Sequence, residues 1–170
     1  MYVKYALGQE KPINFIFDQY EVLTVQIGKP GPILNWLRCV SDYSLLEFGV
    51  SAVDGALNLI KVIQAAGLAQ MRVPDKFPVV EVGVPQFDIH RWGGKRLLDL
   101  DIPVKLSLDR DAILLMIDET RAIDRTILNR NLSFATSEGY PCWVLLSGMT
   151  TEQIRLIRSA VEHDASGGYL

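Results

Sequence analysis

The sequence predicts an α+β protein with a mixed, mostly antiparallel sheet and three to four helices packed mainly on one face. Three observations lead to this prediction. Apolar and polar residues alternate along several short stretches, which is typical of half-buried strands. Other stretches repeat apolar residues at every third or fourth position, as amphipathic helices do. These two kinds of stretch follow one another irregularly, unlike the regular alternation of a doubly wound parallel sheet.

The length and composition indicate a single globular domain spanning residues 1–170. The chain has 49% hydrophobic and 22% charged residues, with a formal net charge of -3. Chains of this length commonly fold around one core, and this apolar fraction excludes wholesale disorder. Such a core needs neither a metal nor a disulfide to hold it together. No segment carries a specific catalytic or ligand motif, so no cofactor is expected.

Strands are predicted wherever β-branched and aromatic residues occur with a period of two. The polar turns at 18–19 and 109–111 each join two such stretches, which predicts two antiparallel hairpins. Residues 112–117 are apolar on both faces, as in a central strand. Pro78 and Pro85 place the strand between them at a sheet edge. The predicted strands cover residues 2–7, 13–17, 22–27, 45–50, 79–84, 87–92, 97–108 with a break at Pro103, 112–117, 132–136 and 142–146.

Helices are predicted in four stretches with apolar residues at helical spacing. The clearest begins at Ser51, a typical N-cap residue, and ends at Gly67, a typical C-terminal stop, although Gly55 weakens its first turn. The last begins at Thr150, with Gln153 placed to complete a capping box. The four stretches are residues 33–40, 51–67, 118–131 and 150–163.

The segment Asp88–Arg96 is the strongest candidate for a binding site. Its Gly93-Gly94 turn exposes backbone N–H groups, and the flanking basic side chains could clamp an anion. It lacks the spacing of a phosphate-binding loop. A solvated turn is the plainer interpretation, binding to an acidic protein surface is the next, and binding to phosphate or nucleic acid is the last. The candidate binding residues are His90, Arg91, Trp92, Lys95, Arg96, Asp99 and Asp101.

Acidic residues collect after this segment. Their spacing does not match a calcium-binding loop, so no metal site is predicted. Aspartate is common in turns because its side chain bonds to nearby backbone, and we expect most of these residues to occupy turns. They are Asp99, Asp101, Asp109, Asp111, Asp118 and Glu119.

The cysteines and tryptophans are expected mostly in the core. Cys39 and Cys142 each lie in an apolar pattern, which predicts buried, reduced thiols. Trp36 and Trp143 also lie in apolar patterns and are expected to be buried. Trp92 stands between Arg91 and Gly93, where core packing competes with a role in a protein interface.

These features favour a small, soluble protein-binding module, such as an immunity protein or another inhibitor that acts through a charged surface. The main alternative is an enzyme with a dispersed acid/base site around His90 and nearby carboxylates. A third interpretation is a subunit that self-associates through an edge strand into a homodimer. The chain contains no basic block and no long apolar run, which argues against nucleic-acid and membrane partners. The cytoplasm is the expected location.

Overall fold

The chain is mostly β. The computed structural model describes residues 2–29, 31, 34–72 and 77–165. Strands hold 50% of the residues and helices 11%. The predicted α+β class, with three to four helices on one face of a sheet, is therefore wrong. The described residues contain one α-helix, α1 (Thr151–Ala165), and one 3-10 helix, η1 (Ile89–Trp92).

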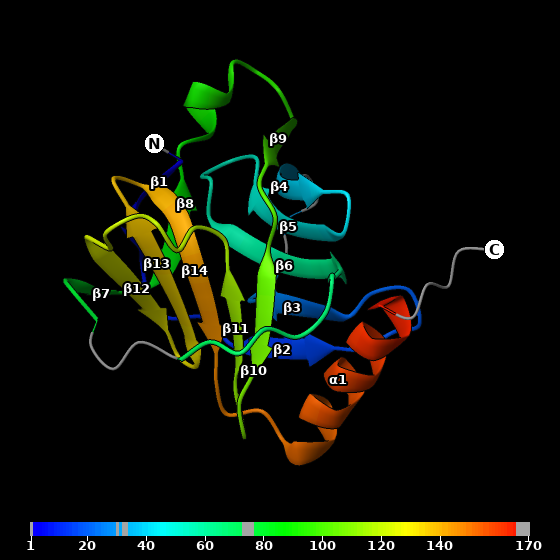
Figure 1. Ribbon diagram of the computed structural model, residues 1–170. Helices are drawn as coiled ribbons and strands as arrows, with labels where there is room; N and C mark the ends of the chain where they lie inside the picture. The colour runs from blue at the N-terminus through cyan, green and yellow to red at the C-terminus, as the bar shows by residue number, and fades with distance from the viewer. Residues whose placement is uncertain (1, 30, 32–33, 73–76, 166–170) are drawn as a thin grey trace.

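Two six-stranded sheets and a two-stranded ribbon make up the fold (Figure 1). Neighbouring strands are antiparallel except in two pairs, β4 with β9 and β7 with β12. The first sheet, which we call the N-terminal sheet, has the order β2 (Ile13–Ile16), β3 (Leu23–Ile27), β6 (Leu57–Gln64), β5 (Ser44–Ser51), β4 (Leu34–Ser41) and β9 (Leu97–Asp101). The C-terminal sheet has the order β10 (Lys105–Leu108), β11 (Ile113–Met116), β14 (Tyr140–Leu146), β13 (Leu132–Ser137), β12 (Arg125–Asn129) and β7 (Val80–Val82). The ribbon pairs β1 (Val3–Leu7) with β8 (Val84–Phe87).

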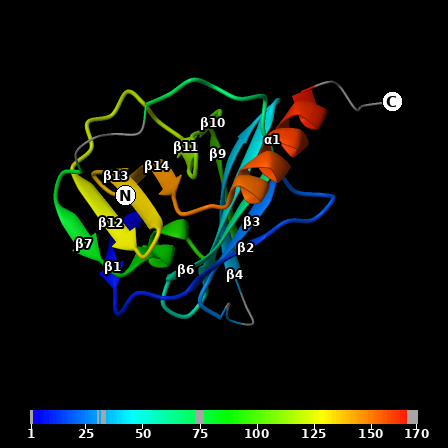
Figure 2. The same ribbon diagram turned by 90° about the horizontal axis from the view of Figure 1, so that it is seen from below.

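The main core lies between the two large sheets. Three buried rings meet there: Phe48 from β5, Phe87 from β8 and Phe134 from β13, with centroids 5.6 to 6.0 Å apart. Each ring comes from a different sheet, so this cluster joins all three. Helix α1 lies next to β2 and β3 in both views (Figures 1 and 2). Ile157 and Val161, on the apolar side of this helix, pack into the same core.

A second apolar cluster covers the outer face of the C-terminal sheet. Leu114 and Trp143 project from this face, and Trp143 is buried as the sequence predicted. Met71 and Phe77, from the connection between β6 and β7, pack over them, and the rings of Phe77 and Trp143 are 5.5 Å apart. This sheet is therefore covered on both faces.

The predicted helix over residues 51–67 is a hairpin turn followed by β6. The Ser51 hydroxyl oxygen accepts hydrogen bonds from the backbone N–H groups of Val53 and Asp54, and the chain then pairs with β5. Five of the seven residues from 57 to 63 are apolar, so apolar spacings of three and four occur there as well as a period of two. The segment becomes a strand because it pairs with β5 in the folded chain.

Two further predicted helices are also wrong. Residues 34–41 form β4, whose Leu37 and Cys39 are buried while their neighbours are only half-buried. In the stretch 118–131, a turn leads into β12. The predicted strand over residues 87–92 is instead the end of β8 followed by η1.

Other local predictions are confirmed. The β2–β3 and β10–β11 hairpins form as expected, and β7 is an edge strand. The capping box at the start of α1 is present. Thr150 donates its backbone N–H to Gln153 Oε1 at 2.8 Å, and Gln153 donates its own to Thr150 Oγ1 at 3.2 Å.

Candidate protein-binding face

The N-terminal sheet has an outer face whose side chains are accessible. Along β4, Leu37 and Cys39 are fully buried in the core, while Trp36, Arg38 and Val40 point the other way and are half-buried. Strand alternation places the corresponding residues of the neighbouring strands on the same side. We call this side the outer face; its central residues are Trp36, Arg38, Val40, Leu45, Glu47, Gly49, Leu59, Lys61, Leu97, Asp99 and Asp101.

An apolar row crosses the outer face. The strand register places Leu59 opposite Gly49, Gly49 opposite Trp36, and Trp36 opposite Leu97. The Trp36 ring lies over Gly49, where a Cβ atom would be 2.9 Å from Trp36 Cζ3. Leu97 is 45% exposed at the end of the row. Because position 49 has no side chain, the indole ring can approach the backbone of β5 closely.

A charged row runs beside the apolar one. The register aligns Lys61, Glu47, Arg38 and Asp99 on four successive strands, with alternating charges. Arg38 donates Nε–H to Asp99 Oδ1 at 2.7 Å and Nη2–H to Asp99 Oδ2 at 2.8 Å. Its Nη1 is 4.0 Å from Glu47 Oε1. Lys61 also forms an ion pair with Glu21. Opposite charges on neighbouring strands attract, so the row supports the register of the sheet.

The pKa values of the two acids in this row shift in opposite directions. Burial raises the pKa of Glu47 above its ordinary value, against the lowering effect of the Arg38 and Lys61 charges. The hydrogen bonds from Arg38 lower the pKa of Asp99. The same contact raises the pKa of the Arg38 guanidinium. Near neutral pH, Asp99 is therefore a carboxylate held in a fixed orientation at the edge of the face.

A hollow of about 440 Å³ lies where the end of β4 meets β9. Asp42 from the β4–β5 turn and Asp99 and Asp101 from β9 line it, together with Val40. Of these three acids, Asp99 alone forms an ion pair among the described residues, and its partner is Arg38. This end of the outer face is consequently acidic.

The predicted binding loop leads directly into this face (Figure 1). His90 and Arg91 are exposed on η1, and Arg91 forms an ion pair with Asp88 at 3.1 Å. Asp88 also pairs with Lys4 at 3.2 Å. This carboxylate is the one nearest to His90 in the sequence, and both of its oxygens are engaged by cations. Trp92 is only 3% exposed and packs in the main core. Of its two predicted roles, core packing is therefore the one that the structure confirms.

The rest of the loop joins η1 to the edge strand β9. Lys95 and Arg96 are exposed, and the Arg96 carbonyl accepts the backbone N–H of Trp36 at 2.7 Å. Asp99 and Asp101 lie on β9, within the strand that the sequence predicts over residues 97–108. The turn prediction holds for Asp109 and Asp118, whose carboxylates accept nearby backbone N–H groups.

Trp36 is the main residue of this face that sequence reasoning missed. The helical spacing of the segment around it predicts a buried position, which is wrong because the segment is the strand β4. In the strand, its neighbours Leu37 and Cys39 occupy the core side, so Trp36 must face outward. The alternation of Leu37, Cys39 and their polar neighbour Arg38 is the signal that could have placed it.

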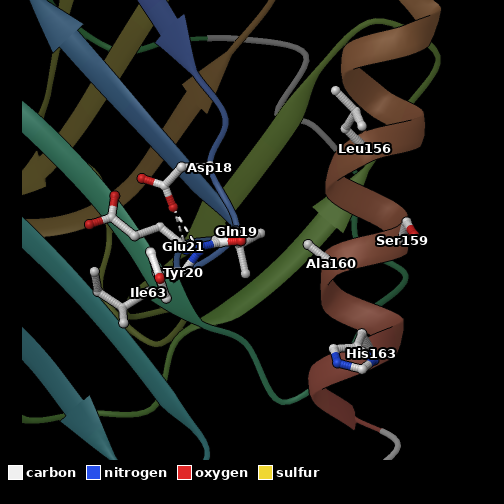
Figure 3. Close-up of a pocket in the computed structure, with 10 residues that line it drawn as sticks. Asp18, Gln19, Tyr20, Glu21, Ile63, Leu156, Ser159, Ala160 and His163 are labelled. Carbon is white, nitrogen blue, oxygen red and sulfur yellow. Dashed lines mark hydrogen bonds between the residues drawn. The ribbon is translucent and has the colours of Figure 1, made fainter.

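A second hollow, of about 320 Å³, lies between α1 and the β2–β3 loop (Figure 3). In Figure 3, Leu156, Ala160 and His163 of the helix lie across from this loop. Asp18 Oδ1 accepts the backbone N–H groups of Tyr20 and Glu21 at 2.7 and 3.0 Å. The acids at this hollow are thus already engaged in local structure, which makes it a weaker candidate than the outer face.

Both cysteines are free and buried, as predicted. Burial raises the pKa of Cys39 to about 12 and that of Cys142 to about 11, so neither thiol is an activated nucleophile. The described residues contain no group of three His, Cys, Asp or Glu side chains arranged to hold a metal ion. Among the same residues, no helix is long and apolar enough to cross a membrane.

Comparisons with known proteins add no further constraint on the site. No protein-family model matches the chain. A search of curated proteins found no significant match.

Proposed function

We propose that this chain is a protein-binding module that holds a partner protein against the outer face of its N-terminal sheet. The observation that carries the proposal is the placement of Trp36. A tryptophan lies over a glycine on an accessible sheet face, between Leu59 and Leu97 and next to Arg38. Tryptophan and arginine are the residues most enriched at the energetic centres of protein interfaces.

The contrast between the two sheets supports this proposal. The outer face of the C-terminal sheet is covered by Met71 and Phe77 of the chain itself. The outer face of the N-terminal sheet keeps Leu97 45% exposed and Trp36 half-buried. An accessible apolar strip bordered by charges has the anatomy of an interface, with an apolar centre and a polar rim.

The charges on this face would orient the partner. Lys95 and Arg96 lie just before β9, and Asp99 and Asp101 lie on it. A partner with the opposite order of charges would be attracted in one orientation and repelled in the reverse one. Such recognition suits an immunity protein or another inhibitor, and blocking the partner's activity is part of the proposal. The proposed location is the cytoplasm, a compartment that suits two free thiols.

Matched variants test this proposal. Tagged wild type, Trp36→Ala and Tyr20→Ala are used to capture proteins from lysates of the source cells, and the retained proteins are quantified by mass spectrometry. Tyr20 is the control because it is an aromatic residue that is 78% exposed in the β2–β3 loop, away from the apolar row. Circular dichroism and thermal melting establish that both variants fold.

The proposal expects a protein that wild type and Tyr20→Ala retain and Trp36→Ala loses. With that protein purified, Trp36→Ala should weaken the affinity by about thirtyfold or more, as truncation of an interface hot spot does. If all three forms retain the same proteins in equal amounts, the outer face is not the binding surface and the proposal fails.

A further inference from the structure

Strand β9 ends the N-terminal sheet with an open edge. It pairs with β4 on one side and is the last strand of the sheet in the described part of the chain. The Arg96 carbonyl accepts Trp36 N–H at 2.7 Å, and Ile102 donates its N–H to the Val40 carbonyl at 3.2 Å. In a parallel pair, every second residue bonds to the neighbouring strand. The backbone groups of Leu97, Asp99 and Asp101 therefore point away from β4.

The side chains of these three residues are also exposed on the outer face. Each is thus available in two ways: its backbone can extend the sheet, and its side chain can contact a neighbour on an added strand.

The charged row predicts what the added strand would carry. Across the sheet, the charges alternate from Lys61 to Glu47 to Arg38 to Asp99, and the row stops at the negative end. The next position in this row would favour a cation, because opposite charges on neighbouring strands attract. The row through Val40 also ends in an acid, Asp101. The apolar row ends in Leu97, where an apolar neighbour would fit.

We propose that the partner contributes an extended segment that adds to the edge of β9, with an apolar residue beside Leu97 and Lys or Arg beside Asp99 and Asp101. This inference rests on the proposed function and specifies the chemistry of the partner. Backbone hydrogen bonds would supply affinity, and the alternate side chains would supply specificity. The apolar strip around Trp36 would then contact the rest of the partner.

Two synthetic peptides test the inference without knowledge of the natural partner. One has the sequence Thr-Val-Thr-Lys-Thr-Lys-Thr, and the other has the reverse order, so that parallel and antiparallel addition are both sampled. In the control peptides, glutamate replaces lysine. Nuclear magnetic resonance of the full chain measures amide shifts and amide hydrogen exchange upon titration.

One lysine peptide should slow amide exchange at Leu97, Asp99 and Asp101 by at least about tenfold, as expected for newly bonded strand amides. The glutamate peptides should leave the exchange rates of these amides unchanged. Asp101→Pro should abolish the protection, because proline removes an outward N–H and blocks the edge, whereas Asp101→Asn keeps the N–H and should only weaken it. Equal effects of lysine and glutamate peptides, or no protection by any peptide, would overturn the inference.

Binding of the captured partner to the Trp36→Ala and Asp101→Pro variants distinguishes a failure of this inference from a failure of the proposed function. If Trp36→Ala loses the partner and Asp101→Pro binds it like wild type, strand addition fails and the proposed function stands. If the lysine peptide protects β9 but Trp36→Ala retains every captured protein, the proposed function fails and the edge remains a peptide-binding site. A dimer in sedimentation that Asp101→Pro dissociates would show that a second copy occupies the edge, and the commitment to a basic partner would be wrong.

Discussion

The Trp36 ring lies across Gly49 on the neighbouring strand, so closely that a Cβ atom at position 49 would be 2.9 Å from Trp36 Cζ3 and 3.2 Å from Leu59 Cβ. Gly49 is thus the surface on which the indole rests. The absence of a side chain at this position determines how far the ring projects into solvent. The geometry of the proposed binding face therefore depends on a residue that would not itself contact the partner.

Gly49→Ala should move the ring without unfolding the protein. The ring can shift because it is the far end of a side chain, whereas Leu59 Cβ can give only slightly. We expect a loss of about 1 kcal/mol in the free energy of unfolding, typical of mild overpacking. Partner affinity should fall by about tenfold if the ring is a hot spot. In the Trp36→Ala background, the same change should leave affinity unaltered; a tenfold loss there would show that Gly49 acts independently of Trp36.

Gly55→Ala should destabilise the fold far more than Gly93→Ala. Both glycines have positive φ, 74° and 61°. A Cβ atom at position 55 would be 2.2 Å from the Phe87 carbonyl oxygen, whereas position 93 has open space. Gly93→Ala should cost about 1 kcal/mol, the backbone term alone, and Gly55→Ala about 3 kcal/mol or more, because β8 must also move. Equal losses in denaturant titrations would contradict this account of the turn.

Phe134→Ala should weaken the contact between the two large sheets. Phe134 is fully buried, and its ring is 5.6 Å from that of Phe48 and 5.9 Å from that of Phe87. Removing a buried ring of this kind costs about 3–5 kcal/mol. Leu97→Ala, on the exposed edge, should cost less than about 0.5 kcal/mol. Urea denaturation of both variants measures the difference, which would vanish if the aromatic cluster did not join the sheets.

Glu47→Gln should gain stability relative to wild type as pH rises. Burial raises the pKa of Glu47 in the folded state, so this carboxyl holds its proton more tightly in the folded chain than in the unfolded chain. Folding stability from this group then falls as pH rises from its ordinary pKa through the raised value. Glutamine does not titrate and escapes this loss. Denaturation at pH 4 and pH 7 should show a larger advantage for the variant at pH 7; the opposite order would mean that attraction from Arg38 and Lys61 outweighs burial.

Both thiols should be inert in the folded protein. Burial raises the pKa of Cys39 to about 12 and that of Cys142 to about 11, and both side chains are fully buried. At pH 8, a thiol-specific disulfide reagent should therefore react slowly with the native chain and rapidly with two thiols after unfolding. Rapid labelling of one thiol under native conditions would show a local opening of β4 or β14.

Features set by neighbouring residues could be predicted from the sequence. The capping box of Thr150 and Gln153 depends on a spacing of three residues. The β2–β3 and β10–β11 hairpins depend on short polar turns between alternating stretches. In each case, the residues that decide the structure lie close together in the chain.

Features that depend on pairing between distant segments of the chain could not be predicted from the sequence. Residues 34–41 and 57–64 have apolar spacings that suit a helix as well as a strand, and they become strands by pairing with β5 and other distant segments. The candidate site depends on the same pairing, because Arg38 and Asp99 are 61 positions apart and meet only through the β4–β9 pair. Of the predicted site residues, Lys95, Arg96, Asp99 and Asp101 adjoin or lie on the outer face, whereas Trp92 belongs to the core.

The central claim is that a partner protein binds the outer face through Trp36. Its most direct test is a calorimetric titration of the captured, purified partner into wild type, Trp36→Ala and Tyr20→Ala. The claim predicts that Trp36→Ala weakens the affinity by about thirtyfold or more while Tyr20→Ala stays within about twofold of wild type. Equal affinities for wild type and Trp36→Ala, with both proteins folded, would contradict it.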